Sequence, residues 1–120
     1  MWSPDGGEIG FTSYRAGKWG LYRKPANNAG TEDRLIESEN PIRSLSWAPD
    51  GRSIVFVSLD PKTLADLWML PLSGDRKPAV WLQTPFSENQ AQFSPDGKWL
   101  AYQSNETGRN EVYVRPFSSS

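Results

Sequence analysis

Apolar and polar positions alternate over short stretches of this chain, and the same alternation returns along it. In residues 8–13 the apolar Ile9 and Phe11 alternate with polar or small neighbours, and Ile54 and Phe56 do the same in residues 53–58. A period of two is typical of a β-strand with two unlike faces. Across windows of about 11 residues or more, the helical amphipathic period does not occur. The pattern therefore predicts an all-β protein.

The alternating stretches belong to a long repeat. Asp5, Asp50 and Asp96 lie 45 and 46 residues apart. In each copy an apolar residue follows the aspartate by four positions, an aromatic residue by six and a serine by eight. Further on, each copy has an apolar–aromatic pair that a proline follows, at 21–22, 67–68 and 112–113. A repeat of this length indicates one supersecondary unit that stacks against its neighbours.

Each copy begins with a Pro-Asp-Gly turn, in SPDG, APDG and again SPDG. Proline presets φ, aspartate bonds to nearby backbone and glycine accepts a positive φ, so the motif predicts a β-hairpin between its flanking strands. Later strands are expected at WGLYRK, DLWMLP and NEVYVRP, with a fourth in the first two copies at DRLIES and AVWLQT. Four strands in about 45 residues are the size of one β-propeller blade. We therefore expect blade repeats at about 1–38, 39–84 and 85–120, with four, four and three strand segments.

The motif aromatic–Ser/Ala–Pro–Asp–Gly, followed by an alternating strand and an aromatic-centred strand, resembles the TolB-type, WD-repeat-like β-propeller repeat of bacteria. Residues 2–6, 47–51 and 93–97 carry it, and the resemblance covers essentially the whole chain. Residues 94–117 are further similar to propeller domains attached to bacterial serine/threonine kinases, on the side of the membrane away from the kinase. The resemblance implies an extracytoplasmic location. Because closed propellers have about four to eight blades, we expect an excerpt of a longer protein or a piece that assembles with copies of itself.

Composition excludes several chemistries. The net charge of −1 gives no attraction to nucleic acid or to an anionic membrane. The sequence has no apolar run of the roughly 20 residues that span a bilayer and, as written, no signal peptide. Cysteine and histidine are both absent, which excludes thiolate or imidazole zinc ligands and a Ser-His-Asp triad. Kinase motifs and a GxSxG elbow are also missing. We expect no catalytic residue, no metal site and no cofactor within this chain.

The remaining candidates have simple structural explanations. The three Pro-Asp-Gly aspartates are expected to form turns, since calcium loops gather their oxygens within about a dozen residues. Five aromatic residues are expected in the core between sheets: Trp47, Trp68, Trp81, Phe93 and Trp99. Trp19 departs from the repeat, and we expect it to be partly exposed.

As function we expect a non-catalytic binding or scaffold module, part of a bacterial sensor or protein-interaction propeller. The resemblance implies a ligand face at the loops between the second and third strands and between blades, with these candidate residues: Arg15, Lys18, Trp19, Arg43, Asn89, Asn105 and Arg109. The alternative is part of the lid-like propeller of a prolyl-oligopeptidase-type serine peptidase whose catalytic domain lies outside this chain. The partner, a protein or a small molecule, is not defined. Unpaired strand edges at both ends predict a homo-oligomer, and two copies would bring together about six blades.

Overall fold

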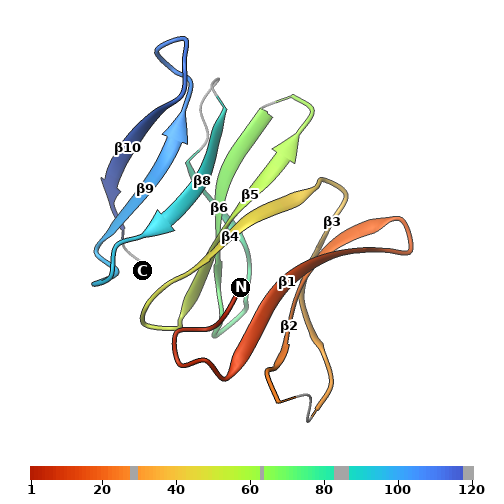
Figure 1. Ribbon diagram of the computed structural model, residues 1–120. Helices are drawn as coiled ribbons and strands as arrows, with labels where there is room; N and C mark the ends of the chain where they lie inside the picture. Colours follow the sequence, from red (N-terminus) through yellow and green to blue (C-terminus); the bar gives the residue numbers. More distant parts are fainter. Residues whose placement is uncertain (28–29, 63, 83–86, 118–120) are drawn as a thin grey trace.

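In the computed structural model, ten strands form three antiparallel sheets (Figure 1). The structure describes residues 1–27, 30–62, 64–82 and 87–117, without the side chains of Ser44 and Asn89. The strands are β1 (Glu8–Arg15), β2 (Lys18–Pro25), β3 (Asp33–Ser38), β4 (Ile42–Trp47), β5 (Ser53–Asp60), β6 (Leu64–Pro71), β7 (Ala79–Leu82), β8 (Glu88–Phe93), β9 (Trp99–Ser104) and β10 (Glu111–Pro116). Every regular element of the described residues is a strand, which confirms the predicted all-β fold.

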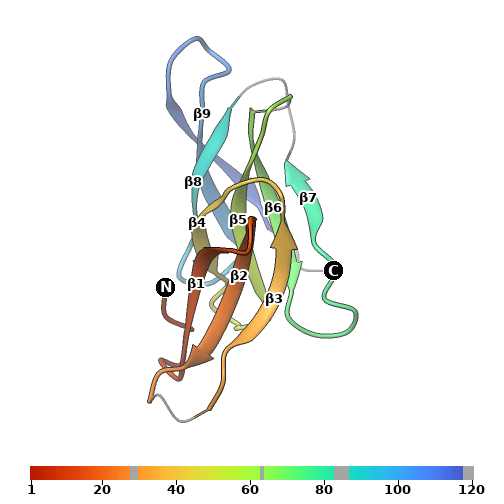
Figure 2. The same ribbon diagram turned by 90° about the vertical axis from the view of Figure 1, so that its right-hand side faces the viewer.

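The sheets follow one another in chain order. The first has the strand order β1-β2-β3, the second β4-β5-β6-β7 and the third β8-β9-β10. Figure 1 shows the sheets side by side, and Figure 2 shows β7 at the outer edge of the second. In the first sheet a single bridge joins Trp2 to Ile9, so a short segment precedes β1 as β4 precedes β5. The described sheets thus contain the four, four and three segments that the sequence predicts.

The Pro-Asp-Gly turns confirm the turn prediction, and they repeat the same glycine N–H bond and the same aspartate-to-backbone bond. Gly6, Gly51 and Gly97 have φ values of 74°, 76° and 74°, the left-handed conformation that favours glycine. Each glycine N–H donates to the carbonyl three residues earlier, at 2.8–2.9 Å. The aspartate side chain then accepts the N–H two residues later: Asp50 Oδ1 lies 2.9 Å from the Arg52 nitrogen. Three local sequences therefore fold into one hairpin geometry without help from distant contacts.

One core cluster lies between the first and second sheets. Leu21 and Leu35 of the first sheet pack in it with Ile42, Trp47, Ile54, Phe56 and Leu70 of the second. Phe56 is 3% exposed, so its predicted position between two sheets is confirmed. Two sheets packed about 10 Å apart exclude water from the side chains between them.

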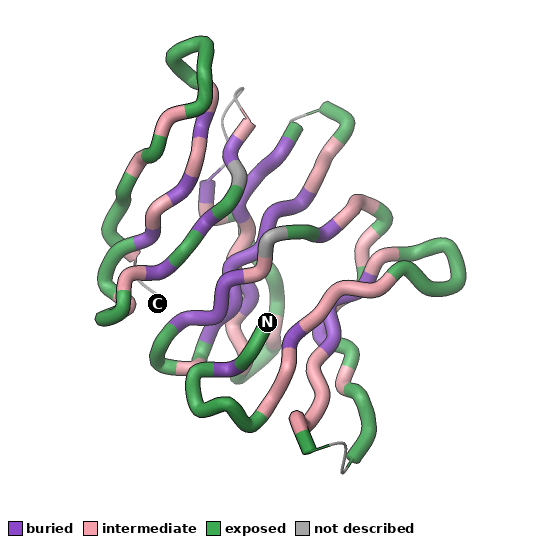
Figure 3. The backbone as a smooth tube through the Cα atoms, viewed as in Figure 1, coloured by how far each residue is buried: buried purple, intermediate pink, exposed green. Residues whose placement is uncertain are grey.

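A second cluster lies between the second and third sheets. Val55, Val57 and Leu67 point to this side of the second sheet, opposite to Phe56. They pack with Ala91, Phe93, Leu100 and Tyr102 of the third sheet. The second sheet is therefore covered on both faces, which explains the continuous burial of residues 53–58 (Figure 3).

An aromatic pair stacks across one antiparallel strand pair of every sheet: β1–β2, β5–β6 and β9–β10. The ring centroids are 5.6 Å apart in Phe11–Tyr22, 6.5 Å in Phe56–Trp68 and 5.9 Å in Tyr102–Tyr113, with interplanar angles of 17°, 19° and 22°. Offset stacking of this kind adds about 0.5–1.5 kcal/mol beyond area burial. The aromatic positions of the sequence repeat thus serve one packing role, three times.

The predicted core position of Trp99 is wrong. Trp47 and Phe93 are buried, and Trp68 and Trp81 pack half-buried against the two clusters. Trp99 is 47% exposed. Its neighbour Leu100 points into the second cluster, and strand alternation sends Trp99 to the opposite face, which no other described sheet covers.

Candidate functional site

The three hairpin loops β1–β2, β5–β6 and β9–β10 lie at one end of the three sheets, and the Pro-Asp-Gly turns lie at the other (Figure 1). We call the first end the loop end; its described residues are 14–18, 59–62, 64–66 and 104–110. The resemblance implies a ligand face at these loops and at the loops between blades. The location of each candidate residue, such as Trp19 or Arg43, can therefore be compared with this predicted ligand face.

Three of the candidates come together at the β1–β2 hairpin. Arg15, Lys18 and Trp19 line one hollow of about 350 Å³, and its other lining residues are Ala16, Tyr22, Arg34 and Glu37. Arg15 and Lys18 are direct cross-strand partners at the end of the ladder, so their side chains share one face of the sheet.

The cations of this hollow are held by carboxylates. Arg15 Nη1 lies 2.7 Å from Glu32 Oε2, and its guanidinium carbon lies 4.4 Å from the centre of the Tyr22 ring. Lys18 Nζ is 3.1 Å from Glu37 Oε1, and Arg34 Nη1 is 2.8 Å from Glu37 Oε2. The hydrogen bond from Arg15 lowers the pKa of Glu32, and the hydrogen bond from Lys18 lowers the pKa of Glu37. Both carboxylates are therefore ionised at neutral pH, and three cations face two anions.

Two aromatic residues, Tyr14 and Trp19, pack together on the same hairpin, and we call this pair the aromatic step. Tyr14 is 62% exposed, and its ring centre lies 5.4 Å from that of Trp19 at an interplanar angle of 54°. Trp19 is half-buried, because one side of it packs against the cluster between the first two sheets. The sequence predicts the partial exposure of Trp19 but not the larger exposure of Tyr14. The cross-strand pairing of the two residues, which follows from the hairpin register, is the signal that could have shown it.

The other candidates do not join this group. Arg43 is exposed on β4, and Asn89 lies in β8 with a side chain outside the described part. Asn105 has a local role, since its Oδ1 accepts the Ser87 N–H at 2.9 Å and its carbonyl closes the β9–β10 loop. Arg109 pairs with Glu111 at 3.5 Å in the same loop.

Comparison with known proteins connects this geometry to a fold. No family model matches the chain. An uncharacterized protein of Agrobacterium fabrum, Atu1656, is 25% identical over an alignment 125 residues long that covers 98% of this chain and 40% of that protein. The crystal structure of TolB from Acinetobacter baumannii superposes with a TM-score of 0.84 at 22% identity, over 98% of this chain and 29% of TolB. The chain has the fold of a TolB-type β-propeller segment.

Other solved structures share this fold with less similarity. Prolyl oligopeptidase B from Galerina marginata matches all of this chain with 20% of its own, at a TM-score of 0.68 and 17% identity. An oligogalacturonate lyase from Vibrio parahaemolyticus matches 99% of this chain with 35% of its own, at a TM-score of 0.76 and 16% identity. The three sheets are thus three successive propeller blades, and the chain spans well under half the length of these proteins.

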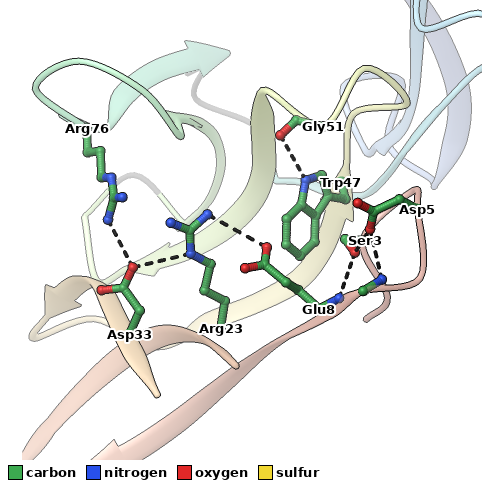
Figure 4. A network of polar contacts seen from close by, with 9 residues as sticks. Ser3, Asp5, Glu8, Arg23, Asp33, Trp47, Gly51 and Arg76 are labelled. Carbon is green, nitrogen blue, oxygen red and sulfur yellow. Dashed lines mark hydrogen bonds and ion pairs between the residues drawn. The ribbon is translucent and has the colours of Figure 1, made fainter. Parts of the chain in front are cut away.

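At the end opposite the loops, a polar network stabilises the first blade and connects it to the second (Figure 4). Arg23 pairs with Glu8 and with Asp33, and Arg76 of the second blade lies 3.1 Å from Asp33. Nearby, the Gly7 N–H donates to Asp5 Oδ1 at 2.8 Å, and this bond is the main reason that the pKa of Asp5 is lowered. These carboxylates are occupied in turns and ion pairs, so we assign this end a structural role.

The described residues support neither a metal site nor a membrane-spanning helix. The described residues contain no cluster of three or more acidic, cysteine or histidine side chains placed to hold a metal ion. Within the same residues, no helix is long and apolar enough to cross a membrane.

Proposed function

We propose that this chain is a non-catalytic binding module of an extracytoplasmic propeller, and that its partner docks on the loop end. The observation that carries the proposal is the exposed Tyr14, whose ring packs at a tilt against Trp19. An aromatic side chain left open to water beside charged residues is typical of binding surfaces, because it supplies contact area at low entropic cost. The extracytoplasmic location rests on the resemblance to TolB-type repeats.

The chemistry of the hairpin favours a partner segment that carries carboxylates. Arg15, Lys18 and Arg34 outnumber Glu32 and Glu37 around the hollow, and Lys18 and Arg34 share one carboxylate. An incoming carboxylate could therefore pair with Lys18 or Arg34 while Glu37 keeps the other. Exposed ion pairs of this kind contribute about 1 kcal/mol or less each. Tyr14 and Trp19 form the next cross-strand pair and lie on the opposite face of the ladder from Arg15 and Lys18, so a partner would contact both by wrapping around the hairpin tip.

Two features of the residues support the proposal that this chain is not catalytic. Without histidine or cysteine, a serine or threonine hydroxyl lacks the imidazole base that activates it in most hydrolases, and no thiolate can attack. Among the described carboxylates, Glu32 and Glu37 of the hairpin are ion-paired and have lowered pKa values, which does not suit a general acid.

The test is a titration of the 15N-labelled chain with a ten-residue glutamate-rich peptide, followed by NMR. We expect saturable shifts of the amide signals of residues 14–19 and a dissociation constant that weakens about fivefold in Lys18→Glu, the loss of about 1 kcal/mol expected for one exposed charge pair. Tyr14→Ala should weaken binding further. The peptide should remain intact, and generic ester substrates should not be hydrolysed.

Two controls make the result specific. A lysine-rich peptide of the same length should leave the spectrum unchanged, and Lys77→Glu, an exposed substitution between β6 and β7 and outside the loop end, should bind as the wild type does. Shifts confined to the Pro-Asp-Gly end, or hydrolysis that copurifies with the chain, would contradict the proposal.

The second candidate is part of the propeller lid of a prolyl-oligopeptidase-type peptidase. The similarity to prolyl oligopeptidase B favours it, although the TM-score to TolB is higher. In both functions the chain itself performs no chemistry. The gene sequence on either side distinguishes them: a downstream domain with a GxSxG elbow supports the peptidase, whereas an upstream kinase domain and transmembrane helix support the sensor.

A further inference from the structure

A hollow of about 230 Å³ lies between the first and second blades, beside β3, the outermost strand of the first blade (Figure 2). Residues of β3, β5 and β6 line it, so both of its sides belong to blades that the structure describes. Further blades before the first or after the third would pack on other faces and would leave this hollow open. The hollow is therefore a feature of these two blades, whatever the length of the whole propeller.

The lining of the hollow is mainly apolar. Phe56 and Trp68, the stacked pair of the second blade, line it together with Ile36 of the first. Trp68 and Ile36 are half-buried at the margin of the core cluster between the two blades, so part of each side chain is open to the hollow. Ser38 and Ser58 add hydroxyl groups. An apolar concave surface with a few polar groups is the usual form of a ligand-binding site.

The next pair of blades shows which side chain such a surface accepts. Leu35 and Trp81 are counterparts, because each lies at the register shift in the outermost ladder of its blade. Trp81 packs against Tyr102, the counterpart of Phe56 in the third blade, with the ring centres 6.2 Å apart and the planes at 81°. Leu35 is smaller and carries no ring. An indole of the chain itself therefore contacts the aromatic pair of the third blade, whereas the pair of the second blade has a hollow beside it.

Positive charge lies at one edge of the hollow. Glu37 lines it and also lines the hollow of the β1–β2 hairpin. Lys18 and Arg34 both pair with this carboxylate, at 3.1 and 2.8 Å. Two cations thus share one anion at the edge of β3, which is complementary to a partner that brings a further carboxylate. Ser38 is also the cross-strand partner of Trp19, so the hollow continues from the face that carries the aromatic step.

We propose that this hollow binds a tryptophan side chain of the partner, within an extended segment that has carboxylates beside it. The inference rests on the proposed function, because the same partner supplies the carboxylates for Lys18 and Arg34. The indole would lie against the Phe56–Trp68 pair, as Trp81 lies against the pair of the third blade. A tryptophan that fills a pocket in this way is typical of the residues that dominate binding energy.

Three ten-residue peptides, titrated into the 15N-labelled chain and followed by NMR, test the inference. A glutamate-rich peptide with a central alanine should shift the amide signals of residues 14–19 but not those of Ile36 and Ser58. The same peptide with a central tryptophan should bind about tenfold tighter and should also shift Ile36, Ser58 and the indole N–H of Trp68. A serine-rich peptide with the central tryptophan should shift this second group at weaker affinity.

The outcomes separate this inference from the proposed function. If the central tryptophan adds neither affinity nor shifts at the hollow, the inference is overturned, whereas the proposed function stands on the alanine peptide. If the serine-rich peptide shifts the hollow and the glutamate-rich alanine peptide shifts nothing, the aromatic site is supported and carboxylate binding at the hairpin is contradicted.

Contacts between peptide and chain test the geometry directly. With the isoleucine methyl groups labelled, the peptide indole should give intermolecular nuclear Overhauser cross-peaks to Ile36. Ile54, which is fully buried between the same two blades, should give none. Cross-peaks to other isoleucine methyl groups without Ile36 would place the indole elsewhere and would overturn the inference.

Two variants test the hollow itself. Leu35→Trp gives the first blade the tryptophan that the second has, and it should remove the tenfold gain without changing the affinity of the alanine peptide. Because Leu35 is buried, circular dichroism checks the fold. Ile36→Ala is a smaller change that removes part of the apolar lining, and it should reduce the gain about threefold. Val114→Ala, an exposed change on the third blade, should keep the gain. A full gain in folded Ile36→Ala would contradict the inference even if Leu35→Trp does not fold.

Discussion

Replacing Phe56 by alanine should lower the free energy of unfolding by about 3–5 kcal/mol. The ring is buried between the first and second blades, where it stacks on Trp68 and packs in one cluster with Leu21 and Leu35. Its removal leaves a cavity that two sheets already in register cannot close. For a small domain with a total stability of about 5–15 kcal/mol, this is a large part of the whole.

The matched control is Phe11→Ala, at the same repeat position in the first blade. Phe11 stacks on Tyr22 in the same way but is half-buried, because no described blade covers its face. Its loss should therefore be less than half that of Phe56→Ala, measured by urea unfolding at concentrations where the chain is monomeric. Equal losses in the two variants would show that burial between blades does not determine the contribution of this position.

Replacing Leu67 by alanine should lower the free energy of unfolding by about 2–5 kcal/mol. Leu67 is fully buried in the other cluster, between the second and third blades, where it packs with Val57 and Leu82 of its own sheet. The effect is independent of the Phe56 prediction because the two side chains lie on opposite faces of the second sheet. Urea unfolding of the variant measures it.

Val112→Ala is the control for Leu67→Ala. Val112 occupies the corresponding position in the third blade and is mostly exposed, so the substitution should cost about 1 kcal/mol or less in the monomer. If Val112→Ala destabilises the monomer as much as Leu67→Ala, the outer face of the third blade is covered in solution by a part of the chain that the structure does not place there.

The sequence predicts local geometry well where the residues that determine it all lie within one short motif. The hydrogen bonds of each Pro-Asp-Gly turn join residues of one six-residue stretch, and apolar and polar positions alternate in the flanking strands. The hairpins can therefore be predicted from the sequence alone. The stacked pairs, such as Phe56–Trp68, follow from the same repeat once the strands are in antiparallel register.

Prediction is weaker where a contact joins distant segments or a strand is irregular. The ion pair between Asp33 and Arg76 joins residues 43 positions apart, and no sequence pattern marks it. The pairing of β4 with β5 and that of β8 with β9 each contain a register shift near the strand centre. In β8, Gln90 has a φ of 54°. Bulges of this kind reorient the side chains on either side of them, so strand alternation alone does not show which way Arg43 points.

Trp99 shows how an aromatic residue can mislead. It lies three residues after the turn aspartate, where the other copies have Glu8 and Ser53, so it does not share a repeat position with the buried aromatic residues. Its strand partner Pro116 lies on the same outer side of the third sheet. The repeat register, applied residue by residue, places this position on the side that faces the next blade, where Ser53 of the second blade is buried; no described blade follows the third.

The central claim is that the three repeats are blades stacked face to face, with the Phe56 ring between the first and second. The most direct test is a nuclear Overhauser spectrum of the methyl-labelled chain. The account predicts cross-peaks from the Phe56 ring protons to the methyl groups of Leu21 or Leu35, which belong to the first sheet. A ring whose cross-peaks stay within its own sheet, to residues such as Ile54 and Leu70 only, would contradict the claim.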